Sequence, residues 1–271
     1  MSTPILEFSN VTLVFDDVVA LENISFRVLE GNSLVVLGAT ASGKSMLLKL
    51  SLGLFRPDAG QIYLFGEQIS GMDEQDLFAI RRQVGMVFQE SALFDSLTVA
   101  ENVAYPLVSR EEASLPPAEV EARVWEALRF VELEEAAAKL PSEISGGMRR
   151  RVAIARAIVH RPRLLLYDSP TEGLDPITAH TIMTLILKER DTQNVSSVLV
   201  THRLQNARLL ANFRFEAERR GLVPARGNGA RRETQTRFVV LREGKLMFEG
   251  DQEELNRQQD PYIRNFVLRS D

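Results

Sequence analysis

Cysteine is absent from the sequence, so a disulfide framework and a thiolate metal site are both excluded. No apolar run approaches the ~20 residues that a membrane-spanning helix requires. The N-terminus, MSTPILEFSN, lacks the basic-then-apolar pattern of a secretory signal. We therefore expect a protein of a reducing compartment that reaches a membrane only through a partner.

Positive charge is also in deficit, with 32 lysines and arginines against 37 acidic residues and a net charge of −5. This balance argues against a surface built to hold nucleic acid, so we expect no nucleic-acid partner. The 271 residues, 45% of them hydrophobic and 25% charged, suit one large globular domain or two small ones.

A glycine-bounded loop joins an apolar run to a helical pattern in the segment SLVVLGATASGKSMLLKL, residues 33–50. The loop, Gly38–Ser45, matches G-x-x-x-x-G-K-S, and its strand–loop–helix context favours a phosphate-binding loop over an ordinary glycine turn. The backbone N–H groups of such a loop form an anion site with the helix N-terminus. Lys44 can reach the β- and γ-phosphates, and Ser45 can ligate Mg²⁺. The pattern predicts that the chain binds a nucleoside triphosphate.

Strand patterns occur on both sides of a middle segment, residues 91–140, that has none. The predicted strands are Ile5–Phe15, Leu21–Val28, Gln61–Phe65, Val84–Phe88, Leu164–Tyr167, Ser197–Val200 and a hairpin at Phe238–Arg242 and Lys245–Glu249. The predicted helices are Met46–Leu54, Asp73–Arg82, Asp95–Val103, Pro117–Phe130, Arg151–Val159, Ile177–Asp191 and Gln205–Leu210. The middle segment is thus a helical insertion in an α/β chain, and the proline-containing stretch 106–117 separates its first two helices.

Two segments near the C-terminus have less regular patterns. Residues 213–237 contain seven arginines against three glutamates, together with several glycines. This composition predicts a mobile basic loop, with an ordered partner contact as the alternative. Residues 251–271 form a C-terminal tail with a short helix, and we expect the tail to contact a dimer mate or another partner.

Two further motifs carry anion or metal chemistry. The apolar run Leu164–Tyr167 ends in Asp168, and a buried strand that delivers one aspartate is how phosphate-loop folds hold Mg²⁺. Ser145 can cap a helix, and Gly146 and Gly147 let a ligand approach the backbone there. A glycine-rich N-cap is the alternative, but two anion sites in one chain suggest that one of them serves the nucleotide of a partner.

Six motifs occur in the order seen in ATP-binding cassette (ABC) transporter ATPases: Gly38–Ser45, Phe88–Gln89, Ile144–Met148, Leu164–Asp168, Gly173–Pro176 and Val200–His202. They fall within residues 5–250, which the resemblance identifies as the ATPase domain. It implies an α/β fold with a RecA-like P-loop core, an antiparallel β-subdomain and an inserted helical subdomain at about residues 91–162. It also implies ATP and Mg²⁺ as cofactors, a homodimer and an integral-membrane permease as partner.

The resemblance assigns a role to each matching residue. Phe15 stacks on adenine, and Asp175 links the two sites of a dimer; a core aromatic is the alternative for Phe15, and a strand-end histidine for His202. The catalytic group is His202, Gln89 and Ser169, and the metal ligands are Ser45, Gln89 and Asp168. The implied nucleotide contacts are Phe15, Gly38, Ala39, Thr40, Ala41, Ser42, Gly43, Lys44, Ser45, Met46, Gln89, Ser145, Gly146, Gly147, Met148, Asp168, Asp175 and His202.

Two residues depart from the family pattern. The loop reads Gly-Ala-Thr-Ala-Ser-Gly where the family commonly has Gly-Pro-Ser-Gly-Ser-Gly, so Ala41 lacks the conformational freedom of glycine. Ser169 stands where the family has the glutamate that polarises the attacking water. Because a serine is not a carboxylate base, we expect slow hydrolysis.

Within the family, Ser-Gly-Gly-Met at residues 145–148 and the ending Asp260–Phe266 resemble the Mla/Mce-type lipid-transport ATPases. This implies phospholipid transport between bacterial membranes, an MCE-type lipid-binding protein in the complex, and a place at the cytoplasmic face of the inner membrane. The alternatives are an ATPase for another substrate and a hydrolysis-impaired clamp or regulatory module of the same fold. A DNA-repair ATPase is disfavoured because the required long coiled coil is absent.

Overall fold

The computed structural model describes residues 4–109, 115–225 and 235–267. The chain divides into two compact units. The first unit comprises residues 1–81 and 186–271, and the second comprises residues 82–185. No helix within the described ranges is both long enough and apolar enough to cross a membrane.

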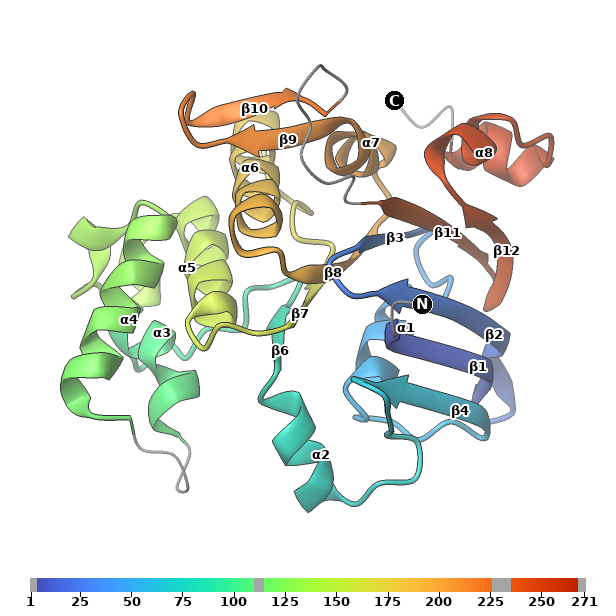
Figure 1. The fold of residues 1–271 in the computed structure, drawn as a ribbon, viewed down its shortest axis with the longest axis horizontal. Helices are drawn as coiled ribbons and strands as arrows, with labels where there is room; N and C mark the ends of the chain where they lie inside the picture. The colour runs from blue at the N-terminus through green and yellow to red at the C-terminus, as the bar shows by residue number, and fades with distance from the viewer. Residues whose placement is uncertain (1–3, 110–114, 226–234, 268–271) are drawn as a thin grey trace. The chain divides into compact units, whose positions relative to one another are not determined.

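One sheet of the first unit is antiparallel and consists of β1 (Pro4–Phe15), β2 (Val18–Leu29), β4 (Ala59–Leu64) and β5 (Glu67–Gln68). The strand order is β2-β1-β4-β5 (Figure 1). Alternate side chains of β1 are buried, as expected for strands with one face against a core. Inside that core Phe8 stacks on Phe26, with ring centroids 4.6 Å apart.

The other large group of strands in the first unit holds the phosphate loop. It contains β3 (Ser33–Gly38), β8 (Ser196–Thr201), β11 (Thr236–Arg242) and β12 (Lys245–Gly250), in the order β12-β11-β3-β8. β11, β3 and β8 run parallel, and every residue of β3 is buried, which explains its continuous apolar run. The helices of this unit are α1 (Lys44–Ser51), α2 (Glu74–Arg81), α7 (Leu204–Asn212) and α8 (Gln252–Asn256).

The second unit is mainly helical. Its two strands, β6 (Val84–Val87) and β7 (Leu164–Asp168), pair in parallel. Its helices are α3 (Val99–Val108), α4 (Pro117–Phe130), α5 (Gly146–Ile158) and the short turns η1 (Glu134–Ala136) and η2 (Pro141–Glu143). α6 (Pro176–Gln193) begins in the second unit and ends in the first.

Most predicted elements are confirmed, with errors at helix ends. The helix predicted at 46–54 begins at Lys44 and ends at Ser51. The helix predicted at 95–103 begins at Val99 because Thr98 and Glu101 form a capping box. It also continues through Pro106 to Val108, so the prediction of a separating segment from residue 106 is wrong. Burial of Val103 and Leu107 holds this last turn in place.

The prediction of a mobile loop from residue 213 is wrong over the described part of that segment. β9 (Phe213–Glu216) and β10 (Gly221–Pro224) form an antiparallel hairpin, which lies near α6 in Figure 1. Arg190 of α6 donates hydrogen bonds to the carbonyls of Leu210 and Phe213, and the carboxylate of Asp191 accepts one from the N–H of Phe215 at 2.6 Å. These long-range bonds, invisible to a local pattern, order the hairpin. Residues 226–234 lie outside the described ranges.

Candidate active site

The loop between β3 and α1 has the geometry of an anion cradle. Gly43 has φ +98°, and a Cβ there would lie 2.9 Å from the Ala20 carbonyl oxygen and 2.6 Å from Leu21 Cδ2, so only glycine fits. The N–H of Ser42 donates to the Ala39 carbonyl at 3.2 Å and closes the turn. α1 starts directly afterwards, and its first N–H groups face the loop.

Lys44 is almost buried, with 8% exposure, and its ammonium lies over the loop. Nζ donates to the carbonyl oxygens of Gly38 at 2.8 Å and Ala39 at 2.6 Å. The dipoles of these two carbonyl groups stabilise the positive charge at the loop. A buried cation in this setting is ready for an anionic ligand.

Ala41, the departure noted in the sequence, has φ +62°. The residue thus keeps the left-handed conformation that glycine adopts without strain, and its Cβ makes that conformation cost about 1–2 kcal/mol. The loop is therefore formed in spite of the alanine.

Phe15 and His202 stand at strand ends in the first unit. Phe15 is the last residue of β1, half-buried, and its ring meets Phe55 edge-on with centroids 5.2 Å apart. His202 follows the last residue of β8 and is also half-buried. Both side chains are partly accessible, as a ligand contact requires.

In the second unit, Asp168 is the last residue of β7 and is buried. Ser169 follows with φ +45° and 7% exposure, and its carbonyl accepts a hydrogen bond from the N–H of Glu172 at 3.0 Å. Gln89 comes just after β6 and is exposed. The unit thus presents a buried carboxylate and a buried hydroxyl at adjacent positions of one turn.

Arg150 of α5 is a neighbour of these groups that the sequence interpretation missed. Its Nη1 donates to the carbonyl of Phe88, the residue before Gln89, at 2.6 Å, and its Nε is buried without a partner. Burial lowers the pKa of this guanidinium, whereas the carboxylates of Glu172, Asp168 and Glu90 raise it. Helical spacing could have indicated that Arg150 is buried, because it places Arg150 on the same face of α5 as Ala153, Ile154 and Ala157, which are buried.

The start of α5 has the predicted cap. Ser145 Oγ accepts a hydrogen bond from the N–H of Met148 at 3.2 Å, so the predicted N-cap is confirmed, although the helix begins at Gly146 and not at Arg151. A Cβ on Gly147 would lie 2.6 Å from Thr178 Cγ2 of α6. The N-termini of α5 and α6 therefore meet at this glycine.

Asp175 caps α6. One carboxylate oxygen accepts hydrogen bonds from the N–H groups of Ile177 and Thr178, both at 3.0 Å, and the other accepts the Thr178 hydroxyl at 2.6 Å. These hydrogen bonds, first of all that of the Thr178 hydroxyl, lower the pKa of Asp175. The residue thus has a structural role at the start of α6.

The described residues contain no group of three or more His, Asp or Glu side chains that could cage a metal ion. The predicted ligands supply single oxygen donors: the hydroxyl of Ser45, the amide of Gln89 and the buried carboxylate of Asp168. Mg²⁺ prefers such a set, because it keeps several waters and takes substrate phosphate oxygens as ligands. The residues present therefore fit magnesium that is bound together with a nucleotide.

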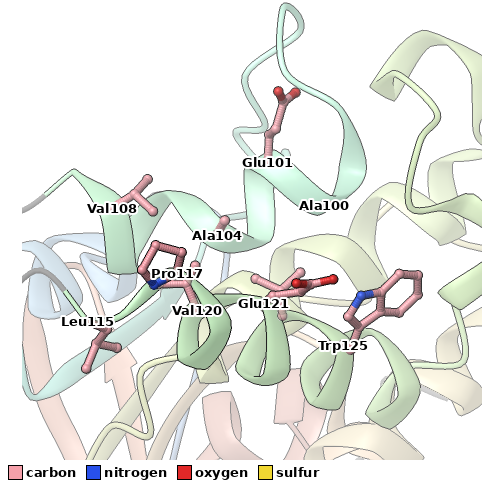
Figure 2. A pocket seen from close by; sticks show the side chains of 10 residues that line it. Ala100, Glu101, Ala104, Val108, Leu115, Pro117, Val120, Glu121 and Trp125 are labelled. Carbon is pink, nitrogen blue, oxygen red and sulfur yellow. The ribbon is translucent and has the colours of Figure 1, made fainter.

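A hollow lies between α3 and α4, and none of the predicted site residues lines it. Its volume is about 460 Å³, and Figure 2 shows the side chains around it, including Val108, Leu115, Val120 and Trp125. The lining is mainly apolar. It offers no cluster of polar groups for nucleotide chemistry.

Comparison with known sequences identifies the family. Residues 21–172 match the family described as ABC transporter. The phospholipid transport ATP-binding protein MlaF of Haemophilus influenzae is 32% identical over 98% of this chain and 91% of its own length. The methionine import protein MetN of Brucella abortus is 37% identical over 78% of this chain, which spans only 56% of MetN. The spermidine/putrescine import protein PotA of Pseudomonas aeruginosa is 38% identical over 74% of this chain, which spans only 53% of PotA.

Solved structures agree. The ATP-binding cassette MJ0796, as a dimer bound to ADP and Pi, has a TM-score of 0.75 and 30% identity, with 91% of this chain and 98% of that chain covered. CbiO1 of Clostridium perfringens has a TM-score of 0.77 and 26% identity, with 98% of this chain and 96% of that chain covered. The predicted α/β ABC ATPase fold is thereby confirmed. This chain belongs to the ABC transporter family and is an ATP-binding subunit with ATPase activity.

Proposed function

We propose that this chain powers phospholipid transport between bacterial membranes, at the cytoplasmic face of the inner membrane and through a separate permease. The observation that carries the proposal is the extent of similarity to MlaF, which includes nearly all of this chain and nearly all of MlaF. The MetN and PotA alignments leave about a quarter of this chain unmatched. The Ser-Gly-Gly-Met loop at residues 145–148 and the tail motif at residues 260–266 support the same assignment.

We assign the nucleotide chemistry to the motif residues. Residues 38–46 bind the triphosphate through backbone N–H groups and Lys44, and Phe15 stacks on the base. Ser45, Gln89 and Asp168 hold Mg²⁺, which neutralises phosphate oxygens when bound. His202 contacts the γ-phosphate, and together with Gln89 it orients the attacking water. These roles follow from the resemblance and agree with the position of each residue in its own unit.

Ser169 does not supply the general base that this arrangement requires. A hydroxyl cannot take the proton of water at neutral pH, so no general base stands at the usual position. Apart from Asp168, which is assigned to Mg²⁺, Glu172 is the nearest carboxylate along the chain, but its charge interacts with Arg150. The serine at position 169 therefore favours a second candidate function, a clamp of the same fold that closes on ATP and hydrolyses it slowly. Phosphate release by the purified protein separates the two.

We further propose that the protein acts as a homodimer in which the Ser145–Met148 loop serves the nucleotide of the partner. Ser145→Arg should abolish ATP-dependent dimerisation, because the long side chain fills the space for the γ-phosphate. Ser145→Ala is the matched control, since it removes the same helix cap without adding bulk. Sedimentation with Mg²⁺ and ATP should show dimers for wild type, weaker dimers for Ser145→Ala, which loses one hydroxyl contact, and no dimers for Ser145→Arg. An unchanged dimer in Ser145→Arg would refute the composite site.

The substrate assignment predicts the composition of the native complex. Purified from its own cells through a tag on this chain, the complex should contain a permease, an MCE-type lipid-binding protein and phospholipid enriched over bulk membrane. Mass spectrometry of proteins and lipids provides the measurement. Co-purification of an amino-acid or polyamine receptor without enriched lipid would contradict the proposal and leave the ATPase assignment untouched.

A further inference from the structure

Tyr262, in the C-terminal tail, reaches the phosphate loop. Its hydroxyl accepts a hydrogen bond from the N–H of Ala39 at 3.0 Å and donates one to the carbonyl oxygen of Leu241 at 3.2 Å. Leu241 pairs with Gly38 at the end of the parallel β11–β3 ladder. The hydroxyl therefore bridges the two strands at the point where β3 turns into the loop.

The tail holds this tyrosine in place. The side chain of Asp260 accepts hydrogen bonds from the N–H groups of Tyr262 at 2.8 Å and Ile263 at 3.0 Å. Ile263 is fully buried, and the Arg242 guanidinium lies 5.2 Å from the centre of the Tyr262 ring. The Asp260 hydrogen bonds, the burial of Ile263 and the Arg242 contact thus fix the position of the Tyr262 ring.

The two backbone polar groups of Ala39, its N–H and its carbonyl, have different partners. Lys44 donates to the Ala39 carbonyl, whereas Tyr262 accepts from the Ala39 N–H. When Lys44 turns to a phosphate it gives up its carbonyl partners. The tyrosine bond takes only the Ala39 N–H and leaves the N–H groups of residues 40–46 for the triphosphate. The tyrosine can therefore hold the entrance of the loop both before and after binding, and such pre-organisation lowers the cost of binding.

The identity of residue 39 makes this contact possible. The family commonly has proline after the first glycine of the loop, and proline has no N–H and a fixed φ. Ala39 supplies the N–H but loses the restraint of the ring, so it has more freedom in the unbound loop. A tyrosine bond to Ala39 restores a restraint by other means.

We propose that Tyr262 is a positioning residue for nucleotide binding, which couples the docking of the C-terminal tail to the conformation of the phosphate loop through the N–H of Ala39. The inference rests on the proposed role of residues 38–46. Tyr262 makes no contact with the reacting atoms in this role; it acts on the affinity for ATP and ADP and not on the chemical step.

The test uses the full-length protein and five variants. Tyr262→Phe removes only the hydroxyl and should weaken ADP and ATP binding about two- to tenfold, as expected for one hydrogen bond. The kcat at saturating ATP should stay near the wild-type value, and the Ala39 amide should exchange its hydrogen faster in the nucleotide-free protein. Tyr63→Phe is the matched control, because Tyr63 bonds Gln61 on β4 and should leave affinity and exchange unchanged.

The Ala39→Pro background separates the bond from general packing of the tail. There the N–H is already absent, so adding Tyr262→Phe should cause no further loss of affinity. An equal loss in both backgrounds, or wild-type affinity and exchange in Tyr262→Phe, would overturn the inference. If Lys44→Ala also binds ADP like wild type, the nucleotide site itself is wrong; if Lys44→Ala fails to bind while Tyr262→Phe is unaffected, only the role of Tyr262 is wrong.

Discussion

Lys44→Ala should abolish ATP turnover while the protein remains folded. The ammonium is held by the carbonyl oxygens of Gly38 and Ala39 within the loop, so its removal takes away a ligand charge rather than apolar packing. Loss of the positive charge leaves the β- and γ-phosphates without their principal side-chain partner. Steady-state phosphate release measures the effect, and circular dichroism verifies the fold.

The matched control for this prediction is Lys49→Ala. Lys49 lies on the same helix, and its ammonium is 5.8 Å from the centre of the Phe55 ring. This substitution should leave turnover close to wild type. Equal losses in the two variants would mean that positive charge on α1, and not the position of Lys44, supports activity.

Ser169→Glu should raise the rate of ATP hydrolysis at least about tenfold, since a positioned general base is typically worth ~10²–10⁴ in rate. The nucleotide affinity should change little, because the new carboxylate acts on the transition state. Ser169 already has a positive φ, so serine and glutamate carry similar backbone strain there. Phosphate release by both proteins, alone and with the permease, provides the comparison.

Ser169→Gln is the control, since it has the size of glutamate without its basicity. It should hydrolyse ATP no faster than wild type. A brisk wild-type rate with no gain from Ser169→Glu would place the base elsewhere, and Glu172→Gln would then test the remaining nearby carboxylate. Equal gains in the glutamate and glutamine variants would show that bulk, and not basicity, changed the rate.

The sequence predicted those parts of the site that a local pattern determines. The phosphate loop needs a buried strand, a glycine at a left-handed position and a helix start within a few residues, and each leaves a mark in the sequence. The Ser145 cap and the Asp168 strand end are local in the same sense. For this reason the loop, the cap and the strand end occur where the pattern placed them.

Groups joined over long sequence distances could not be found in this way. Arg150 contacts the Phe88 carbonyl, and Tyr262 contacts Ala39, across separations that no short pattern spans. The β9–β10 hairpin has an arginine-rich composition typical of a loop, but Arg190 and Asp191 of α6 hold its backbone. Tertiary hydrogen bonds thus overrode composition at residues 213–224.

Equilibrium binding of ATP to wild type and Lys44→Ala, side by side in Mg²⁺, tests the central claim most directly. Wild type should bind one nucleotide per chain, with competition by ADP, and Lys44→Ala should show no saturable binding over the same concentrations. Nucleotide binding of equal affinity by the two proteins would contradict the assignment of residues 38–46 as the triphosphate site.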